Sequence, residues 1–260
     1  MSAPASAPWP GEREARDQQL FDTIAARYCR KDLLPASRIA RRHRLIQTLK
    51  VVPEVHQPAV LEVGCGAGFS ATYLAGYYAS YLGVDYAQQL IAYAQQHNQG
   101  VGVTFEAHNI KDYHAPQRFD IVFMIGVLHH IDDLDVALAH LLKLLKPGGW
   151  LVANEPHPGN PLISLARAVR QKIDRQYSSD QQPLSATDLR RLYDRAGLVD
   201  IRIVPQGLLS TPFAEVILSP QAIMRVFSSL ACALDASLAR CVGRLLQPLT
   251  WNLIAAGRKP

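Results

Sequence analysis

The stretch Val60-Leu61-Glu62-Val63-Gly64-Cys65-Gly66-Ala67-Gly68 joins an apolar run to three glycines at alternate positions. The apolar residues before Gly64 are typical of a central parallel strand, which is buried on both faces. Glycine adopts positive φ and has no side chain, so the following segment predicts a tight turn that leaves room for a ligand beside its backbone. We therefore expect a strand, a ligand-binding loop and a helix in succession.

The spacing of these glycines bears on the kind of ligand. Dinucleotide-binding loops have the pattern G-x-G-x-x-G and hold a pyrophosphate at the helix N-terminus. Here the pattern is G-x-G-x-G, and Phe69 stands where the third glycine would fall. Glu62, just before the loop, would repel a pyrophosphate but would favour an ammonium or sulfonium group. The pattern thus favours a cationic ligand over NAD.

Three segments resemble one protein family. The phrase from Glu62 to Gly68 resembles motif I of the class I S-adenosylmethionine-dependent methyltransferases. Residues 119–149, with F-D-I-V-F, L-H-H-I-D-D and L-K-P-G-G, resemble the signature that follows motif I in the small-molecule members. Residues 21–28 resemble the segment before motif I in quinone-biosynthesis-type methyltransferases. The resemblance covers about residues 21–155 and implies S-adenosylmethionine as cofactor and S-adenosylhomocysteine as product.

The expected fold is α/β, with a Rossmann-like, seven-stranded, mostly parallel sheet, helices on both faces and an antiparallel last strand. Apolar runs predict strands at 60–63, 81–85, 103–107, 119–126, 150–154, 199–204 and 251–257. Helical patterns are expected at 12–50 with a break at Pro35, at 71–75, at 88–98, from Asp132 as N-cap through Leu145, and at 185–197, where Ser185 and Asp188 form a capping box.

The chain of 260 residues is expected to form one domain with insertions. Residues 1–11 are expected to be a disordered tail and 12–260 a single methyltransferase domain, with 12–50 as a helical cap and 156–183 and 206–248 as substrate-side insertions. In the last of these, Phe227, Leu230 and Leu234 follow helical spacing, as do Leu238, Cys241 and Leu245. The ordinary interpretation is a helix packed on the core. The segment is too charged and too short to span a bilayer. The alternative is therefore an apolar lid over the acceptor or a contact with the membrane surface.

Composition limits the remaining function classes. Hydrophobic residues make up 48% and charged residues 19%, as in a globular protein. Four cysteines without a C-x-x-C pair, and a start without a secretory signal pattern, indicate a cytoplasmic protein. The net charge is +5, but the basic residues are dispersed and not interleaved with aromatics, so the sequence does not favour a nucleic-acid partner.

The cofactor site is expected at the ends of the first strands. Asp85 ends the second strand about twenty residues after the glycine loop, where a carboxylate accepts from both ribose hydroxyls. The resemblance implies that Tyr86 packs on the adenine, that Tyr28 closes over the cofactor, and that Asn109, where the family usually has Asp, accepts from the adenine amino group. Tyr28 packed on the sheet edge and His108 facing the cofactor are the alternatives. The predicted cofactor-binding residues are Tyr28, Glu62, Gly64, Cys65, Gly66, Gly68, Asp85, Tyr86, Asn109, Ile110, Ile125 and Gly126.

Methyl transfer from a sulfonium needs alignment, exclusion of water and, for some acceptors, a base. His129, beside the end of the fourth strand, is the predicted catalytic base. In the family the L-H-H phrase at residues 128–130 often orders the loop without accepting a proton, and this structural role is the alternative for His129. Polar residues near the same strand ends are predicted to bind substrate: His130, Glu155, His157 and Asn160. No metal site is predicted, because adjacent histidines diverge and no second cluster completes a ligand shell.

The predicted function is transfer of a methyl group from S-adenosylmethionine to a small, moderately apolar acceptor through an O, N or C nucleophile. One alternative is an RNA or protein methyltransferase, which would need a basic groove or a target-recognition motif after the fourth strand. Another is a non-catalytic cofactor-binding partner subunit, which would be expected to have lost the glycines or Asp85. The acceptor and the oligomeric state do not follow from the sequence.

Overall fold

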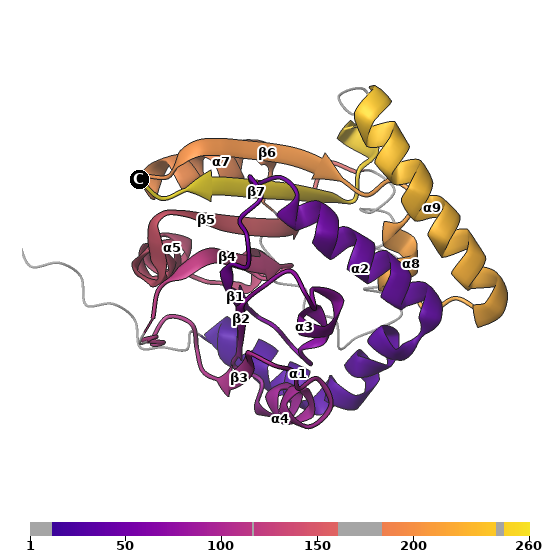
Figure 1. Cartoon of the computed structure of the whole chain (residues 1–260), viewed down its shortest axis with the longest axis horizontal. Coiled ribbons are helices and arrows are strands. Elements are labelled where there is room, and N and C mark those ends of the chain that lie inside the picture. Colours follow the sequence, from indigo (N-terminus) through magenta and orange to yellow (C-terminus); the bar gives the residue numbers. More distant parts are fainter. Residues whose placement is uncertain (1–11, 116, 161–183, 243–246) are drawn as a thin grey trace, which may run out of the picture.

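A computed structural model describes residues 12–115, 117–160, 184–242 and 247–260 (Figure 1). The predicted tail at 1–11 and most of the predicted insertion at 156–183 lie outside the described residues. Seven strands form one sheet in the order β3-β2-β1-β4-β5-β7-β6. Their bounds are β1 Ala59–Val63, β2 Ser80–Asp85, β3 Val103–Ala107, β4 Phe119–Ile125, β5 Leu145–Pro156, β6 Val199–Gln206 and β7 Asn252–Arg258.

The strand directions confirm the predicted Rossmann-like sheet. The pairs β1–β2, β1–β4, β2–β3 and β4–β5 are parallel, and β7 runs antiparallel to both β5 and β6. From β1 the chain builds β2 and β3 on one side and then crosses to β4 on the other. In such sheets ligands bind outside the carboxyl ends of the strands at this reversal, so the site is expected where β1, β2, β4 and β5 end.

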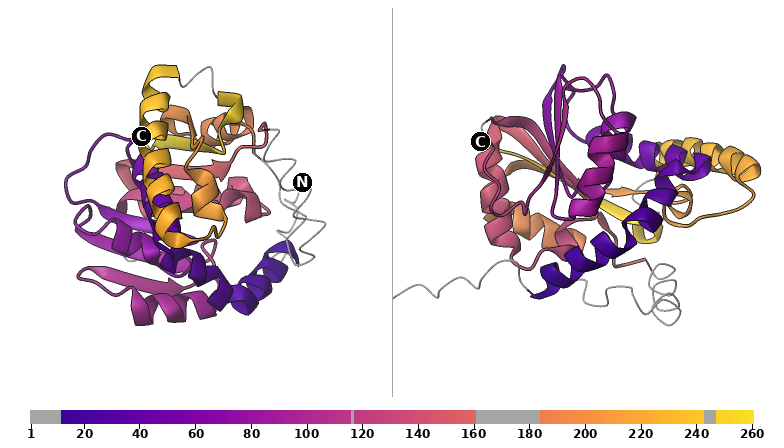
Figure 2. Two further views of the ribbon diagram at one scale, coloured as in Figure 1. Left: turned by 90° about the vertical axis from the view of Figure 1, so that its right-hand side faces the viewer. Right: turned by 90° about the horizontal axis from the view of Figure 1, so that it is seen from below.

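Helices cover both faces of the sheet, as Figures 1 and 2 show. The helical elements are α1 Glu12–Leu33, α2 Pro35–Leu49, α3 Phe69–Tyr73, α4 Gln88–His97, η1 Leu128–His130, α5 Leu134–Leu144, α7 Ala186–Arg195, α8 Thr211–Glu215, α9 Gln221–Val242 and η2 Gln247–Leu249. Proline occupies the first turn of α2, where its missing N–H costs no helical hydrogen bond. The predicted break at Pro35 is confirmed.

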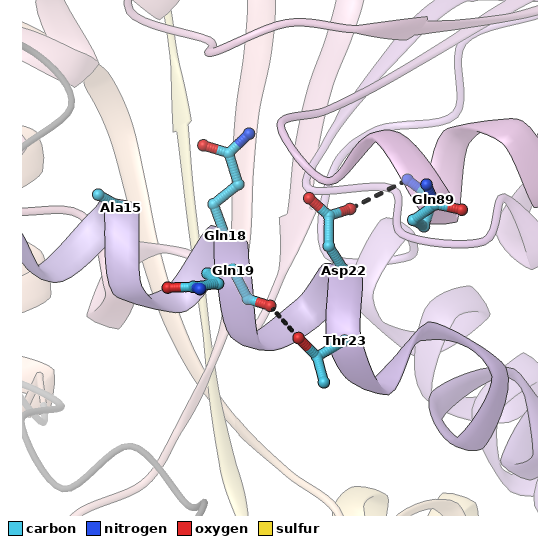
Figure 3. A pocket seen from close by; sticks show the side chains of 6 residues that line it. All are labelled: Ala15, Gln18, Gln19, Asp22, Thr23 and Gln89. Atoms are coloured by element: carbon cyan, nitrogen blue, oxygen red, sulfur yellow. Dashed lines mark hydrogen bonds between the residues drawn. The ribbon is translucent and has the colours of Figure 1, made fainter.

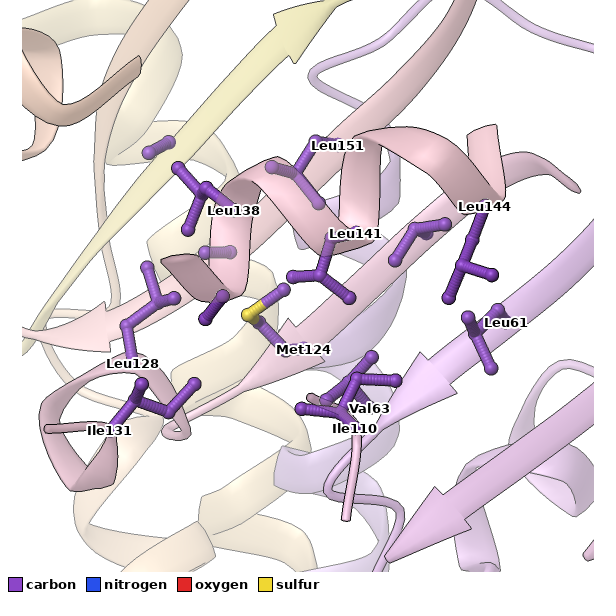
Figure 4. Close-up of a cluster of buried hydrophobic side chains, with 14 of the residues drawn as sticks. Leu61, Val63, Ile110, Met124, Leu128, Ile131, Leu138, Leu141, Leu144 and Leu151 are labelled. Carbon is purple, nitrogen blue, oxygen red and sulfur yellow. The ribbon is translucent and has the colours of Figure 1, made fainter. Parts of the chain in front are cut away.

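The period-two alternation of the strands divides the core between the two faces. Leu61, Val122 and Met124 join the cluster under α5 and α7, which Figure 4 shows from close by. Their neighbours Val60 and Ile121 join the cluster on the opposite face, beneath α2, α3 and α4. Both faces of the central strands are therefore apolar and buried, which is why their sequences read as continuous hydrophobic runs.

Two predicted boundaries are wrong by a few residues. Asp133, and not Asp132, is the N-cap of α5, and its side chain accepts from the Val136 N–H. The Asp132 N–H instead donates to the Glu14 carboxylate of α1 (3.1 Å), because the short helix η1 delays the start of α5. In addition, α5 ends at Leu144 and β5 begins directly afterwards, five residues before the predicted strand. The predicted capping box of α7 is confirmed.

The insertion after β6 contains α8 and the long helix α9, which lies along α2 at the outside of the molecule (Figures 1 and 2). Its buried residues are Ser228, Ala231, Cys232 and Asp235. The Ser228 hydroxyl donates to the Ala36 carbonyl (2.8 Å), a close approach that only small side chains allow. The expectation that Phe227, Leu230 and Leu234 pack on the core is wrong, since they are about half exposed.

Within the described ranges, no helix combines the length and the apolar content that a membrane span needs.

Candidate active site

The glycine loop follows β1 and makes the predicted tight turn. Gly64, Gly66 and Gly68 have φ values of 68°, 53° and 76°. A Cβ on Gly64 would come within 2.5 Å of Val127, and one on Gly68 within 2.5 Å of the Phe105 ring. These two glycines are therefore required by the packing of the protein itself, in addition to any ligand.

Cys65 and Glu62 lie beneath the loop and not on its open side. Cys65 is buried, and its sulfur lies where a side chain on Gly83 would be. Glu62 is 3% exposed and accepts hydrogen bonds from the hydroxyls of Ser70 (2.8 Å) and Tyr81. Burial raises the pKa of Glu62 to about 8, although both hydroxyls oppose the rise. The carboxyl group thus joins β1 to β2 and α3 through the Tyr81 and Ser70 hydroxyls, and these contacts leave it little exposed surface for the cationic group expected beside it.

Asp85 ties the end of β2 to the glycine loop. The Gly66 N–H donates to Oδ2 of Asp85 (2.8 Å) and the Ala87 N–H to Oδ1 (2.9 Å). Burial raises the pKa of Asp85, and these backbone donors oppose the rise. A carboxylate offers about four lone-pair positions, so each oxygen can accept another hydrogen bond. The structure therefore holds Asp85 rigidly beside the loop, where ribose binding was predicted.

The residues predicted to surround the adenine differ in how far they are buried. Tyr86 is half-buried against an apolar cluster with Phe21, and its carbonyl accepts from Gln18 of α1 (2.9 Å). Oδ1 of Asn109 accepts from the Lys111 N–H (3.0 Å), which orders the turn after β3. Ile110 is buried in the core, and the His108 side chain is 57% exposed. The predicted Tyr28 lies on α1, but its side chain is outside what the structure describes.

The loop after β4 is built on a single carboxylate, Glu155 of β5. Gly126 has a φ of 69°, and its N–H donates to the Asn154 carbonyl (2.7 Å). Oε1 of Glu155 then accepts from the N–H groups of Val127 and Leu128, both at 2.9 Å. Glu155 is fully buried, so the structure places it as the support of η1 and gives it no direct access to a substrate. Ile125, also predicted at the site, is half-buried just before this turn.

His129 and Glu155 form a buried dyad. Nδ1 of His129 lies 2.6 Å from Oε2 of Glu155, and the histidine is 7% exposed. Burial alone would raise the pKa of Glu155, but His129 and the loop amides outweigh it, and the pKa is lowered. An ionised Glu155 accepts from Nδ1–H, which leaves the Nε2 lone pair of His129 as a proton acceptor. The Gly126 backbone lies beside the imidazole edge, since a Cβ there would be 3.7 Å from Cε1.

His130 points toward α1 instead. Its Nδ1 lies 2.8 Å from Oδ2 of Asp17, and its ring packs edge-on against Phe21. The two adjacent imidazoles still contact each other, with ring centroids 4.1 Å apart. Because each histidine has its own carboxylate partner, the pair does not converge on one metal ion. Among the described residues, no group of three or more His, Cys, Asp or Glu side chains could hold a metal.

Helix α1 crosses the carboxyl ends of the strands and is fixed by polar contacts. Nζ of Lys111 donates to Oε1 of Glu14 (2.5 Å), and both residues are buried. Further along, Asp22 accepts from the Gln89 N–H at the start of α4 (3.0 Å). Figure 3 shows a pocket between α1 and the start of α4, lined by Ala15, Gln18, Gln19, Asp22, Thr23 and Gln89. None of the predicted site residues lines it.

The last two predicted substrate residues join the end of β5 to the start of β7. His157 is buried, and its Nδ1 lies 3.2 Å from the Thr250 carbonyl. Asn160 is fully buried, and its amide donates to the Leu249 carbonyl (2.6 Å). The structure brings Asp85, the glycine loop and His129 to the same edge of the sheet. It gives His157 and Asn160 contacts that hold two chain segments together.

Three polar residues of α1 that contact the site were not predicted from the sequence: Glu14, Asp17 and Gln18. Asp17 and Glu14 are 3% and 7% exposed. Their spacing of one helical turn was visible, but a carboxylate in an amphipathic helix is ordinarily solvated. Nothing in the local pattern showed that these acids have partners more than ninety residues away.

Comparisons with known proteins agree with this geometry. Residues 61–153 match the family model described as "Methyltransferase domain". The chain is 36% identical to a ubiquinone biosynthesis O-methyltransferase of Thiobacillus denitrificans over 35% of this chain and 41% of that protein. It is 30% identical to a fatty-acid O-methyltransferase of Mycolicibacterium smegmatis over 45% of this chain and 43% of that protein. The matched part thus spans about two fifths of the length of these relatives.

A solved structure extends the likeness to the whole fold. Magnesium protoporphyrin IX methyltransferase from Synechocystis PCC 6803, with bound S-adenosylhomocysteine, superposes with a TM-score of 0.62 at 16% identity, over 96% of this chain and 100% of that one. With the strand order and the glycine loop, the match to the family model identifies residues 61–153 as a methyltransferase domain of the class I S-adenosylmethionine-dependent type, and the chain as a whole has the fold of that class.

Proposed function

We propose that this protein transfers a methyl group from S-adenosylmethionine to a small, moderately apolar acceptor. The observation that carries the proposal is the hydrogen bond between the Gly66 N–H and Asp85, which fixes the two predicted cofactor-binding segments against each other. Both segments lie at the carboxyl ends of adjacent parallel strands, where ligands bind in this architecture. The methyl group of the sulfonium is already activated, so positioning accounts for much of the catalysis.

We further propose that His129 is the base and Glu155 its positioning residue. Nε2 of His129 would take the proton of the acceptor as the new bond to the methyl carbon forms and the carbon–sulfur bond breaks. The electron pair of that bond stays on sulfur and gives S-adenosylhomocysteine. Oε2 of Glu155, 2.6 Å from Nδ1, holds the imidazole in the tautomer with a free Nε2 and stabilises the imidazolium that results.

The names of the relatives and the proposed base support one acceptor class. The two curated relatives are named for ubiquinone biosynthesis and for fatty acids, and both names specify an O-methyltransferase. A hydroxyl must lose its proton as it attacks the methyl carbon, and His129 would accept that proton. We therefore favour an oxygen nucleophile on an apolar molecule. Residues 12–50, 156–183 and 206–248 are proposed to form its surroundings, because α1 crosses the site and α8 and α9 follow β6.

A cytoplasmic location is part of the same proposal. The described cysteines Cys29, Cys65 and Cys232 are free and buried, as is common in proteins of reducing compartments.

Labelled-methyl transfer tests the proposed function. The protein is incubated with S-adenosylmethionine carrying a labelled methyl group and with extract of its own cells, and the products are partitioned. Label in the organic fraction, dependent on the protein, is the expected result. Label in RNA or protein would contradict the proposed acceptor class. Binding of the cofactor without any transfer would instead indicate a non-catalytic partner subunit.

A further inference from the structure

A buried carboxylate of α1 that has no part in the proposed chemistry lies beside the proposed base. Asp17 is 3% exposed, and its Oδ2 lies 2.8 Å from Nδ1 of His130, the residue after His129. Phe21, one helical turn further along α1, packs edge-on against the same imidazole, with ring centroids 5.8 Å apart. A carboxylate with so little exposure is costly unless it is hydrogen-bonded. The contact is therefore a specific feature of the site and differs from a surface ion pair.

The short helix η1 depends on contacts from outside itself. It contains three residues, Leu128–His130, and short 3₁₀ helices have poor hydrogen-bond geometry of their own. Oε1 of Glu155 accepts from N–H groups at its start, and Oε2 lies 2.6 Å from Nδ1 of His129. Asp17 contacts its last residue, His130. The helix is thus held between β5 on one side and α1 on the other.

Contact between the two histidine rings passes the restraint from α1 to His129. The hydrogen bond to Glu155 fixes the position of Nδ1, but the plane of the ring can still turn about that bond. The His130 imidazole lies against the ring, with centroids 4.1 Å apart and an angle of 41° between the two planes. Without Asp17, the His130 side chain could adopt another rotamer and would no longer restrict its neighbour. The direction of the Nε2 lone pair of His129 therefore depends on a residue of α1.

Helix α1 has docking contacts that do not involve η1. The Gln18 amide donates to the Tyr86 carbonyl (2.9 Å), and Asp22 accepts from the Gln89 N–H (3.0 Å). Both contacts join α1 to the segment after β2. The effect of Asp17 on η1 can therefore be separated from the docking of the helix by substitution.

We infer that Asp17 is a positioning residue of the proposed methyl transfer. It acts through His130, which keeps the imidazole of His129 in one orientation. The inference rests on the proposed function, in which His129 is the base. Base, acceptor and methyl group must meet in one geometry, and a misplacement of about 1 Å costs about 10²-fold in rate. The base is thus fully oriented only while α1 lies across the site.

Two measurements on the full chain test the inference. The first is NMR of the histidine ring nitrogens, which reports the tautomer and the order of each imidazole and needs no acceptor. His129→Gln assigns the signals of His129. The second is the rate of labelled-methyl transfer from saturating S-adenosylmethionine to the organic fraction of the cell extract. Both are made on the same set of variants.

The variants separate the contact with His130 from the docking of α1. Asp17→Ala removes the carboxylate and favours the helix, whereas Asp17→Asn keeps an acceptor oxygen for His130. Asp22→Ala is the matched control, because it removes a carboxylate contact of the same helix that does not reach η1. His130→Ala removes the same restraint from the other end, so the test does not depend on the folding of one variant.

We expect Asp17→Ala and His130→Ala to broaden or average the His129 ring signals and to lower the transfer rate about 10- to 100-fold. Asp17→Asn and Asp22→Ala should resemble the unmodified protein in both measurements. Unchanged His129 signals or an unchanged rate in Asp17→Ala would overturn the inference. Equal changes in Asp22→Ala would also overturn it, since they would assign the effect to docking of α1 in general.

A failure of the proposed function gives a different result. The unmodified protein would then transfer no label to the organic fraction, while the His129 signals would still respond to Asp17→Ala and not to Asp22→Ala. That outcome would support the restraint on the His129 ring and contradict its use in methyl transfer.

Discussion

The buried Glu62 leads to a specific prediction about stability and pH. Its folded pKa is raised to about 8, chiefly because burial disfavours the charged form. In the unfolded chain the same group ionises near 4.5. Between these two pH values the folded protein keeps the proton that the unfolded chain has lost. A carboxyl group with a raised pKa therefore stabilises the fold least at high pH, and its contribution is fully present only below about pH 4.5.

The size of the effect follows from the two pKa values. Each pKa unit corresponds to about 1.4 kcal/mol. The interval from 4.5 to about 8 thus corresponds to a loss of up to about 5 kcal/mol in the free energy of unfolding as the pH rises. Glu62→Gln removes the titration but keeps the shape of the side chain and an acceptor oxygen for the Ser70 or Tyr81 hydroxyl. The variant should equal the unmodified protein at pH 5 within about 1 kcal/mol and exceed it by about 3–5 kcal/mol at pH 9.

Urea unfolding at pH 5, 7 and 9, followed by circular dichroism, measures this difference. Glu54→Gln is the control, because Glu54 is exposed and should leave the pH dependence unchanged. Asp85, whose pKa is also raised by burial, keeps part of the slope in both proteins. If Glu62→Gln lowered stability equally at all three pH values, the buried carboxyl would be ionised at neutral pH and the reasoning would be refuted.

Three further predictions concern the site and its supports. His129→Gln should lower kcat by about 10²–10⁴-fold, while calorimetry shows unchanged cofactor affinity. Unaltered kcat would assign His129 to loop structure. Gly68→Ala, at a φ of 76° with no room for a Cβ, should lower the thermal midpoint by several degrees, and by more than Gly76→Ala, which shares the strain of a positive φ (88°) but whose Cβ would meet nothing within 4 Å. Lys111→Met should destabilise the chain by about 3–5 kcal/mol, because it leaves the Glu14 carboxylate buried without its cationic partner. Amide hydrogen exchange in α1 should then become faster. Unchanged exchange would mean that the Lys111–Glu14 pair does not hold the helix.

Much of the fold could be predicted because its signals are local. The central strands are buried on both faces, so their apolar runs stand out, and the glycine loop after β1 has a spacing that few other structures need. Element boundaries were less certain, as at Asp132, because η1 depends on the buried Glu155 from a distant strand. Hydrogen bonds between residues 27 positions apart leave no mark on local periodicity.

Helix α9 shows what the spacing of apolar residues cannot predict. The spacing of Phe227, Leu230 and Leu234 predicted the helix correctly but not the side that it buries. Periodicity reports that apolar residues share a face, whereas burial depends on what the neighbouring helix offers. Ala36 and Ala40 of α2 are small and accommodate Ser228 and Cys232, so the larger residues are left outside.

The site was likewise predicted in part. Asp85 and the glycines could be found because their roles depend on their positions at strand ends. For Glu62 the sequence placed a carboxylate next to the ligand loop, but it could not show that Tyr81 and Ser70 enclose it. The contacts of α1 with His130 and Lys111 depend on tertiary packing alone.

The central claim is that the glycine loop and Asp85 together bind S-adenosylmethionine. Isothermal titration of the unmodified protein, of Asp85→Asn and of the control Asp112→Asn tests it most directly. Asp112 is an exposed surface carboxylate, so its variant should bind normally. Loss of one charge-assisted hydrogen bond costs about 1.5–3 kcal/mol, so Asp85→Asn should bind about 10- to 150-fold more weakly. Equal affinity of all three proteins, or no binding by the unmodified chain, would contradict the account.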